Sequence, residues 1–194
     1  MAKSASRSTE VALSAPARLA LFGAPPLLEG EDPAAYDGML ERICDTVKPA
    51  DIIEEIWVRD VVDLTWETLR LRRFKSQLLT ANMHQGLKVV LVPLCGYREA
   101  EDLSADWAKR EAYAIKQVNE LLAGADLTMN EVMSETLAVK ISDFERIDRL
   151  IMSAEARRNA VLREIDRHRA NLGQALRQAS DVEDAEFVEI EGPQ

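Results

Sequence analysis

Residues 153–176, SAEARRNAVLREIDRHRANLGQAL, lie within the most regular apolar pattern of this 194-residue chain. From Phe144 to Ala179, apolar positions recur alternately three and four residues apart, a spacing held for five repeats. This is the heptad seam of a coiled coil. The spacing predicts a long C-terminal helix within residues 141–180, and with it an all-α protein built as a helical bundle.

Two polar residues, Arg158 and His168, interrupt the seam. Polar residues on a seam weaken packing but fix its register and the number of partners. We therefore predict that the seam is a self-association surface, formed by Ile147, Ile151, Ala154, Arg158, Val161, Ile165, His168 and Leu172. The alternative is a buried stripe shifted around the helix and carried by Leu150, Leu162 and Leu176. Antiparallel packing on the chain's own second helix satisfies either interpretation.

The C-terminal helix is also rich in arginine, although the chain carries a net charge of −10. Residues 145–178 hold eight Arg and five acidic residues. Acids three or four positions from an Arg form pairs along a helix, so we predict a solvated coiled-coil surface. The alternative is a nucleic-acid-associated factor that also uses the basic cluster RLRRFK, residues 70–75. Its candidate polyanion-binding residues are Arg70, Arg72, Arg73, Arg157, Arg163, Arg167 and Arg169.

Local start and stop signals predict a helical body over residues 31–140. Asp32 and Pro33 begin a first helix, because aspartate can cap a helix and proline suits the first helical position. This helix is expected to end at Pro49. A second helix runs from about residue 52 into the low eighties, and a further helix covers residues 104–122, with Gly124 just past its end. Acid-x-x-Glu or Thr/Ser-x-x-Glu capping boxes begin at Asp51, Thr128 and Ser142.

The stretch GLKVVLVPLCGY, residues 86–97, is ambiguous. Its apolar run is compatible with a short buried strand. Because the chain offers no second strand for pairing, a short helix or an extended connection is the preferred interpretation.

Both ends of the chain differ in composition from the body. Residues 1–30 are predicted to be a flexible tail followed by a Pro-punctuated strap that lies across the helices. Residues 181–194 carry six acids and no base, which is typical of a solvated, disordered tail. The alternatives for this acidic tail are a short linear motif and a segment that folds back over the Arg-rich helix.

Few residues indicate a catalytic, metal-binding or phosphate-binding site. The two histidines, His84 and His168, have no second ligand at metal-binding spacing, and no Gly-rich phosphate loop is present. Cys95 follows an apolar run but lacks the turn that exposes a nucleophile, so a Cys-dependent enzyme is a distant third hypothesis. No apolar run approaches eighteen residues. We expect no catalytic activity, cofactor, metal or membrane span, and the two separate cysteines favour a reducing cytoplasm.

Three stretches carry a resemblance to a known family: GEDPAAYDGML, VKPADIIEEIWVRDVVDLTWETLRLRR and RIDRLIMSAEARRNAVLREIDRHR. They resemble a set of uncharacterised helical proteins common in alphaproteobacterial genomes, over residues 22–187. The resemblance implies a bacterial cytoplasmic protein and transfers no activity. The leading hypothesis is therefore a non-catalytic interaction or assembly protein that self-associates through its C-terminal helix.

Overall fold

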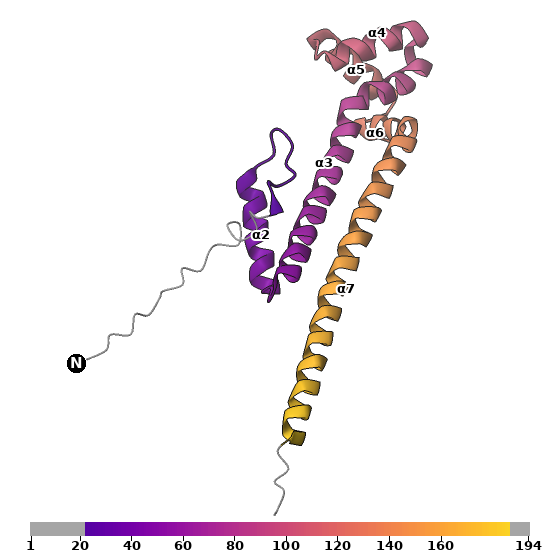
Figure 1. Ribbon diagram of the computed structural model, residues 1–194. Helices are drawn as coiled ribbons and strands as arrows, with labels where there is room; N and C mark the ends of the chain where they lie inside the picture. Colours follow the sequence, from indigo (N-terminus) through magenta and orange to yellow (C-terminus); the bar gives the residue numbers. More distant parts are fainter. Residues whose placement is uncertain (1–21, 187–194) are drawn as a thin grey trace, which may run out of the picture. The chain divides into compact units, whose positions relative to one another are not determined.

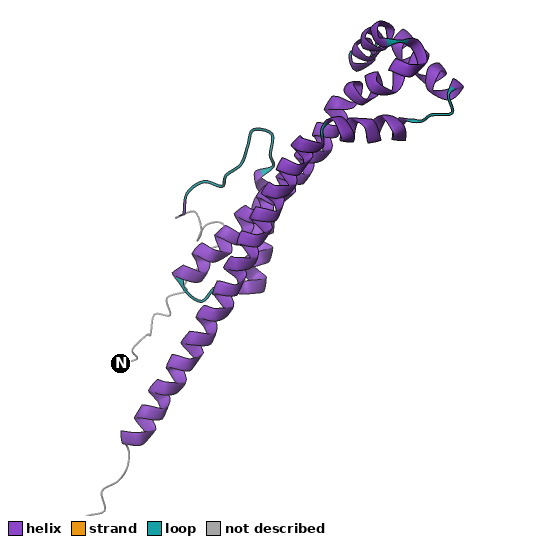
Figure 2. Ribbon diagram, turned by 90° about the vertical axis from the view of Figure 1, so that its right-hand side faces the viewer, coloured by secondary structure: helices purple, strands orange, loops and turns teal. Residues whose placement is uncertain are grey.

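The computed structural model describes the backbone of residues 22–186 and the side chains of residues 22–178 (Figure 1). Within that range all regular elements are helices joined by short loops, which confirms the predicted all-α class (Figure 2). The helices are α2 (Pro33–Val47), α3 (Ile52–Cys95), α4 (Tyr97–Ala108), α5 (Ala112–Gly124), α6 (Met129–Val139) and α7 (Ile141–Glu186). Residues 1–21 and 187–194 of the predicted tails lie outside the described residues.

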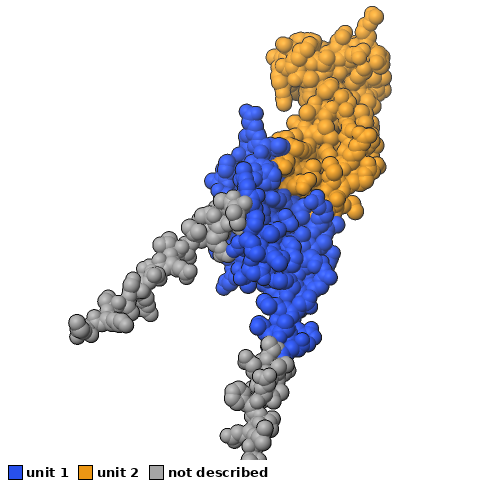
Figure 3. Space-filling model, viewed as in Figure 1, with its two compact units in different colours: residues 1–66, 155–194 blue, residues 67–154 orange. Residues whose placement is uncertain are grey.

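The chain divides into two units, coloured separately in Figure 3. Unit 1 combines residues up to Trp66 with those from Glu155 onward, and unit 2 spans Glu67–Ala154. α3 and α7 each contribute to both units. The C-terminal helix is not the only long one, because α3 has 44 residues and α7 has 46.

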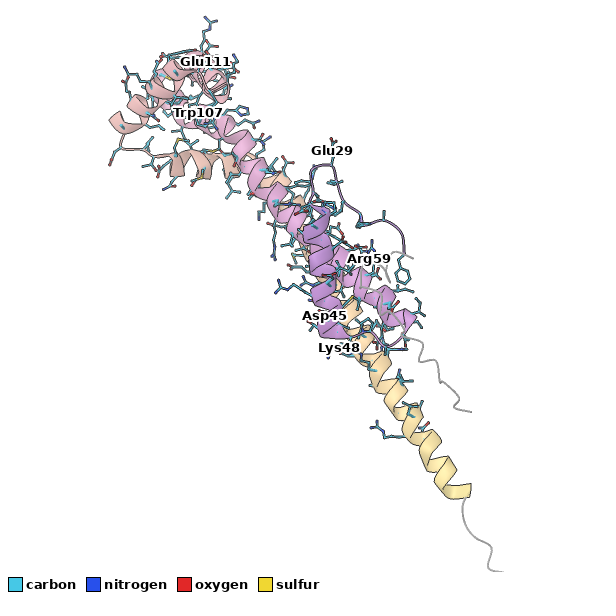
Figure 4. The ribbon with its side chains drawn as sticks, turned by 90° about the vertical axis from the view of Figure 1, so that its left-hand side faces the viewer. Glu29, Asp45, Lys48, Arg59, Trp107 and Glu111 are labelled. Atoms are coloured by element: carbon cyan, nitrogen blue, oxygen red, sulfur yellow. The ribbon has the colours of Figure 1, made fainter. Side chains whose placement is uncertain are left out.

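The core of unit 1 joins α2 to the first half of α3. Buried residues recur every four positions on α2, and a matching row lies on α3, so one face of each helix is covered by the other. The segment before α2 crosses this core near Arg59 (Figure 4), and its Glu31 carboxylate accepts a hydrogen bond from Trp66 Nε1 at 2.9 Å. The core residues are Tyr36, Leu40, Cys44, Val58, Val62 and Trp66.

The core of unit 2 gathers the last turns of α3 with α4, α5 and α6. α6 approaches α3 closely at Gly86, where a Cβ atom would overlap Thr136 and the Val132 carbonyl oxygen. Only a residue without a side chain allows this contact. The buried residues are Leu87, Val90, Leu91, Ala100, Leu103, Ala114, Val118, Leu122 and Val132.

Helix α3 does not end in the low eighties, as the sequence had predicted. It continues through the ambiguous stretch 86–97 to Cys95, with Pro93 inside its last turn. The reason is that Leu87, Val90 and Leu91 have helical spacing and are buried by the neighbouring helices. Gly96, with a φ of 88°, then turns the chain into α4.

Other predicted boundaries also need correction. The expected helix over residues 104–122 is two helices, because the chain breaks between Ala108 and Ala112 with Arg110 in the left-handed region. Gly124 is the last residue of α5, and the capping box at Ser142 is wrong because α7 already begins at Ile141. The capping box at Thr128 is confirmed. α7 runs to Glu186, six residues into the predicted acidic tail.

Candidate functional site

The seam positions form the buried side of α7. Ala154 is 2% exposed and Ile165 is 4% exposed. Five further seam positions are half-buried, whereas Leu172 is 47% exposed. The alternative stripe of Leu150, Leu162 and Leu176 is exposed along its whole length. The half-buried positions are Ile147, Ile151, Arg158, Val161 and His168.

In unit 1, the first turns of α3 cover the seam near His168. The Nε2 atom of His168 lies 2.7 Å from an Asp51 carboxylate oxygen. Its ring packs edge-on against Trp57, with 5.4 Å between ring centroids. Further along α3, Asp60 lies near Arg157, which comes eleven residues before His168 on α7. The two helices are therefore antiparallel here.

The adjacent residue, Arg169, ties α7 to both neighbouring helices. Its guanidinium donates two hydrogen bonds of 2.8 Å to the carboxylate of Glu54 on α3, and one of 2.7 Å to the Val47 carbonyl at the end of α2. The hydrogen bonds from Arg169 hold the pKa of Glu54 below its ordinary value, against the opposing effect of burial. This is a two-point carboxylate clamp, the geometry to which arginine is suited.

Asp51 and Glu54 form only half of the predicted capping box. Asp51 accepts the backbone N–H of Glu54 at 2.9 Å, as a helix cap does. The Glu54 carboxylate instead accepts the N–H of Ala50, and it faces Arg169. The pKa of Asp51 is lowered first by that N–H of Glu54 and then by its contact with His168. Sequence reasoning assigned Glu54 to capping and missed its contact with α7.

Beyond Arg169, α7 extends past the ends of α2 and α3, the two helices that it contacts in unit 1. α3 begins at Ile52 and α2 ends at Val47, which lies against Arg169, but α7 continues to Glu186. We call residues 170–186 the overhang, and at 1.5 Å per residue it is about 25 Å long. Its free end continues past α2 and α3 in Figure 1. Two leucines of the overhang, Leu172 and Leu176, are 47% and 63% exposed.

The predicted polyanion-binding arginines differ in their surroundings. Arg169 is held by Glu54, and Arg167 pairs with Glu164 one turn earlier on α7. Arg157 lowers the pKa of Asp60 on α3, although burial and Asp63 raise it by more. Arg163 is exposed. These four residues belong to unit 1, whereas Arg70, Arg72 and Arg73 belong to unit 2 and make contacts of their own. Nucleic-acid binding by these residues stays a prediction.

Unit 2 contains an open cavity of about 560 Å³ at the junction of α3, α4 and α5. Cys95 is part of its wall, and its thiol donates to the Leu91 carbonyl oxygen at 3.4 Å. Burial, with a smaller effect of Glu99, raises the pKa of this thiol, so its nucleophilic thiolate form is disfavoured. The sequence did not predict this cavity, because its walls come from the segments whose boundaries were misplaced.

Two further searches concern metal ligands and membrane spans, and both cover only residues 22–186. No group of three or more His, Cys, Asp or Glu side chains is arranged there to hold a metal ion. None of the described helices is both long and apolar enough to span a membrane.

The described chain is thus an all-α protein, and in its first unit α3 and α7 pack antiparallel. Comparison with protein-family models, with curated proteins and with solved structures finds no match. The resemblance to the alphaproteobacterial family therefore stays a prediction.

Proposed function

We propose that this protein is a non-catalytic interaction and assembly protein that self-associates through α7. One observation carries the proposal: the seam that α3 covers at His168 continues onto the overhang, where Leu172 is exposed and Leu176, from the alternative stripe, is exposed one turn further on. Removing apolar side chains from water is the main favourable term in association, at about 25 cal/mol per Å². A second helix that packs on the overhang removes both leucines from water.

The contacts within unit 1 narrow the predicted surface. Ile165 is buried and His168 is held by Asp51, so neither is available to a second chain without displacing α3. Leu172 is the one proposed seam residue that is exposed. Leu176, one turn further on, joins it. Self-association at this end of α7 leaves the packing of unit 1 intact.

Sedimentation velocity over a concentration series tests the proposal. The full chain is expected to sediment faster as its concentration rises, and the double variant Leu172→Gln/Leu176→Gln is expected to remain a monomer. Met152→Gln is the matched control, because Met152 is also on α7 and is 68% exposed. A wild-type chain that stays monomeric throughout, or a double variant that assembles like wild type, refutes the proposal.

A further inference from the structure

We infer that a second cavity, between α2, α3 and the segment before α2, binds a small aliphatic amino acid in its zwitterionic form. We call that segment, residues 22–32, the strap. Arg59 on α3 binds the carboxylate of the ligand, and Asp37 on α2 binds its ammonium group. The inference does not depend on the proposed self-association, because none of the residues that line this cavity is on α7.

The cavity has the size and the surface of a small-molecule site. Its volume is about 300 Å³, and pockets that bind small molecules typically measure about 300–1,000 Å³. The strap that forms one side of it is held to the core of unit 1 by the hydrogen bond from Trp66 to Glu31. Apolar surface comes from Ala24, Pro25, Tyr36 and Leu40, and the two charged lining residues are Arg59 and Asp37.

Arg59 is a buried cation whose hydrogen-bond donors are only partly used. The residue is 7% exposed and lies beside the strap (Figure 4). Of the five N–H donors of an arginine, Nε donates to Asp63 at 3.2 Å and Nη2 donates to the Gly23 carbonyl oxygen at 3.5 Å. No described residue accepts a hydrogen bond from Nη1. Since every fully buried side-chain nitrogen of the described residues has a partner, Nη1 reaches open space, and Arg59 borders this cavity.

A carboxylate is the ligand group that matches the unused edge of this guanidinium. Two N–H groups of one arginine bind two carboxylate oxygens, as Arg169 does with Glu54. Asp63 does not form such a pair with Arg59, because the contact uses Nε alone and the same carboxylate oxygen also accepts the Tyr36 hydroxyl. The Tyr36 ring lies 5.5 Å from the guanidinium carbon and restrains its orientation. The Nη1–Nη2 edge of Arg59 is therefore open to a carboxylate from a ligand.

Asp37 favours a ligand that also carries a positive charge. Its side chain is half-buried and has no hydrogen bond or ion pair with a described residue. Burial and Asp63 raise the pKa of Tyr36 most, and the smaller effects of Arg59 and Asp37 place both charges near its hydroxyl. A phosphate sets further negative charge against Asp37, whereas an ammonium group is attracted to it. An α-amino acid carries the carboxylate and the ammonium group on one carbon atom, and an aliphatic side chain matches the apolar surface.

Titration of the full chain with L-leucine, followed by amide NMR shifts, tests the site. Shifts are expected in the strap and around Asp37. Two analogues remove one charge each: 4-methylpentanoate lacks the ammonium group, and isoamylamine lacks the carboxylate. Each is expected to bind about tenfold more weakly than leucine, because a charge-assisted hydrogen bond contributes roughly that factor.

Substitutions assign the two contacts. Asp37→Asn is expected to remove the preference for leucine over 4-methylpentanoate. Asp45→Asn is the matched control, because Asp45 is an exposed acid of the same helix that does not line the cavity (Figure 4). Arg59→Lys keeps the charge without the two-point geometry and is expected to weaken both carboxylates about tenfold. Because Asp37 makes no contact that the fold needs, its variant tests the site even if Arg59→Lys does not fold.

Three results overturn the inference. The first is the absence of shifts with leucine at millimolar concentration, and the second is shifts confined to the cavity at α4 and α5. The third is equal binding of leucine and 4-methylpentanoate to the wild-type chain, which contradicts the role of Asp37. The sedimentation experiment is a separate measurement, so failure of this site leaves the proposed self-association unaffected.

Discussion

Arg169 and Glu54 form a two-point ion pair between α7 and α3, in which both hydrogen bonds are 2.8 Å long and the glutamate side chain is 2% exposed. The two residues are far apart in the sequence. Because Val47 accepts a third hydrogen bond from the same guanidinium, this one side chain joins all three helices of unit 1. The pair therefore fixes the position from which the overhang departs.

Arg169→Met is expected to lower the free energy of unfolding by about 2 kcal/mol, because it leaves the Glu54 carboxylate buried without its partner. The value is below that of a fully buried pair because the Arg169 side chain is 42% exposed and water reaches it. Urea unfolding measures the loss. Arg167→Met, which removes an exposed pair with Glu164, is the control and is expected to change stability by less than about 0.5 kcal/mol. Equal losses of unfolding free energy in the two variants contradict a stabilising role for the Arg169–Glu54 pair.

The contribution of Glu54 to stability is expected to disappear in acid. Its pKa is lower in the folded chain than its ordinary value of 4.5, so the carboxylate stabilises the fold above that value. This contribution is lost as the pH falls below 4.5 and through the lowered pKa. The difference in unfolding free energy between wild type and Glu54→Gln measures it. That difference is expected to shrink as the pH falls, and a difference independent of pH would falsify the prediction.

Much of this fold can be predicted from local signals. Asp32 and Pro33 begin α2 as expected, because a capping side chain and a proline act through residues next to them. The break between α4 and α5 has no such signal, since Arg110 adopts its left-handed conformation without a glycine. The end of α3 was misplaced for a related reason. Its last turns are stabilised by burial against α4, α5 and α6, which is a property of the tertiary structure.

The candidate site is likewise only partly predictable from the sequence. Heptad spacing predicts which side of α7 is buried, because the spacing is a property of one helix. It does not encode what covers that side, and in unit 1 the cover near His168 is the chain's own α3. The overhang depends on the start of α3 lying beside Arg169, a contact between residues 115 positions apart that no local pattern encodes.

Cys95 is expected to react slowly with thiol reagents near neutral pH, and faster as the pH rises. Burial raises the pKa of its thiol, so little thiolate is present near neutrality. Ellman's reagent, followed at a series of pH values, measures the rate. Cys44, which is 8% exposed, is expected to react only after denaturation and serves as the internal reference. Rapid labelling of Cys95 at neutral pH would instead indicate an activated thiol and revive the Cys-dependent enzyme hypothesis.

Gly86→Ala is expected to destabilise unit 2, because the new Cβ atom overlaps backbone atoms of α6, the Thr136 nitrogen and the Val132 oxygen. Backbone atoms cannot move aside as the end of a long side chain does. We expect a loss of about 1–3 kcal/mol in unfolding free energy, larger than the helix-propensity gain of alanine over glycine. Thermal or urea unfolding measures it.

The matched control for that substitution is Gly38→Ala, at a helical glycine of α2 where an added methyl group meets nothing within 4 Å. With no neighbour to displace, the propensity gain remains and the variant is expected to be more stable by about 0.5–1 kcal/mol. The two substitutions are chemically identical, so opposite signs isolate the contact between α3 and α6. If Gly86→Ala also stabilises the protein, α6 does not pack against α3 at Gly86.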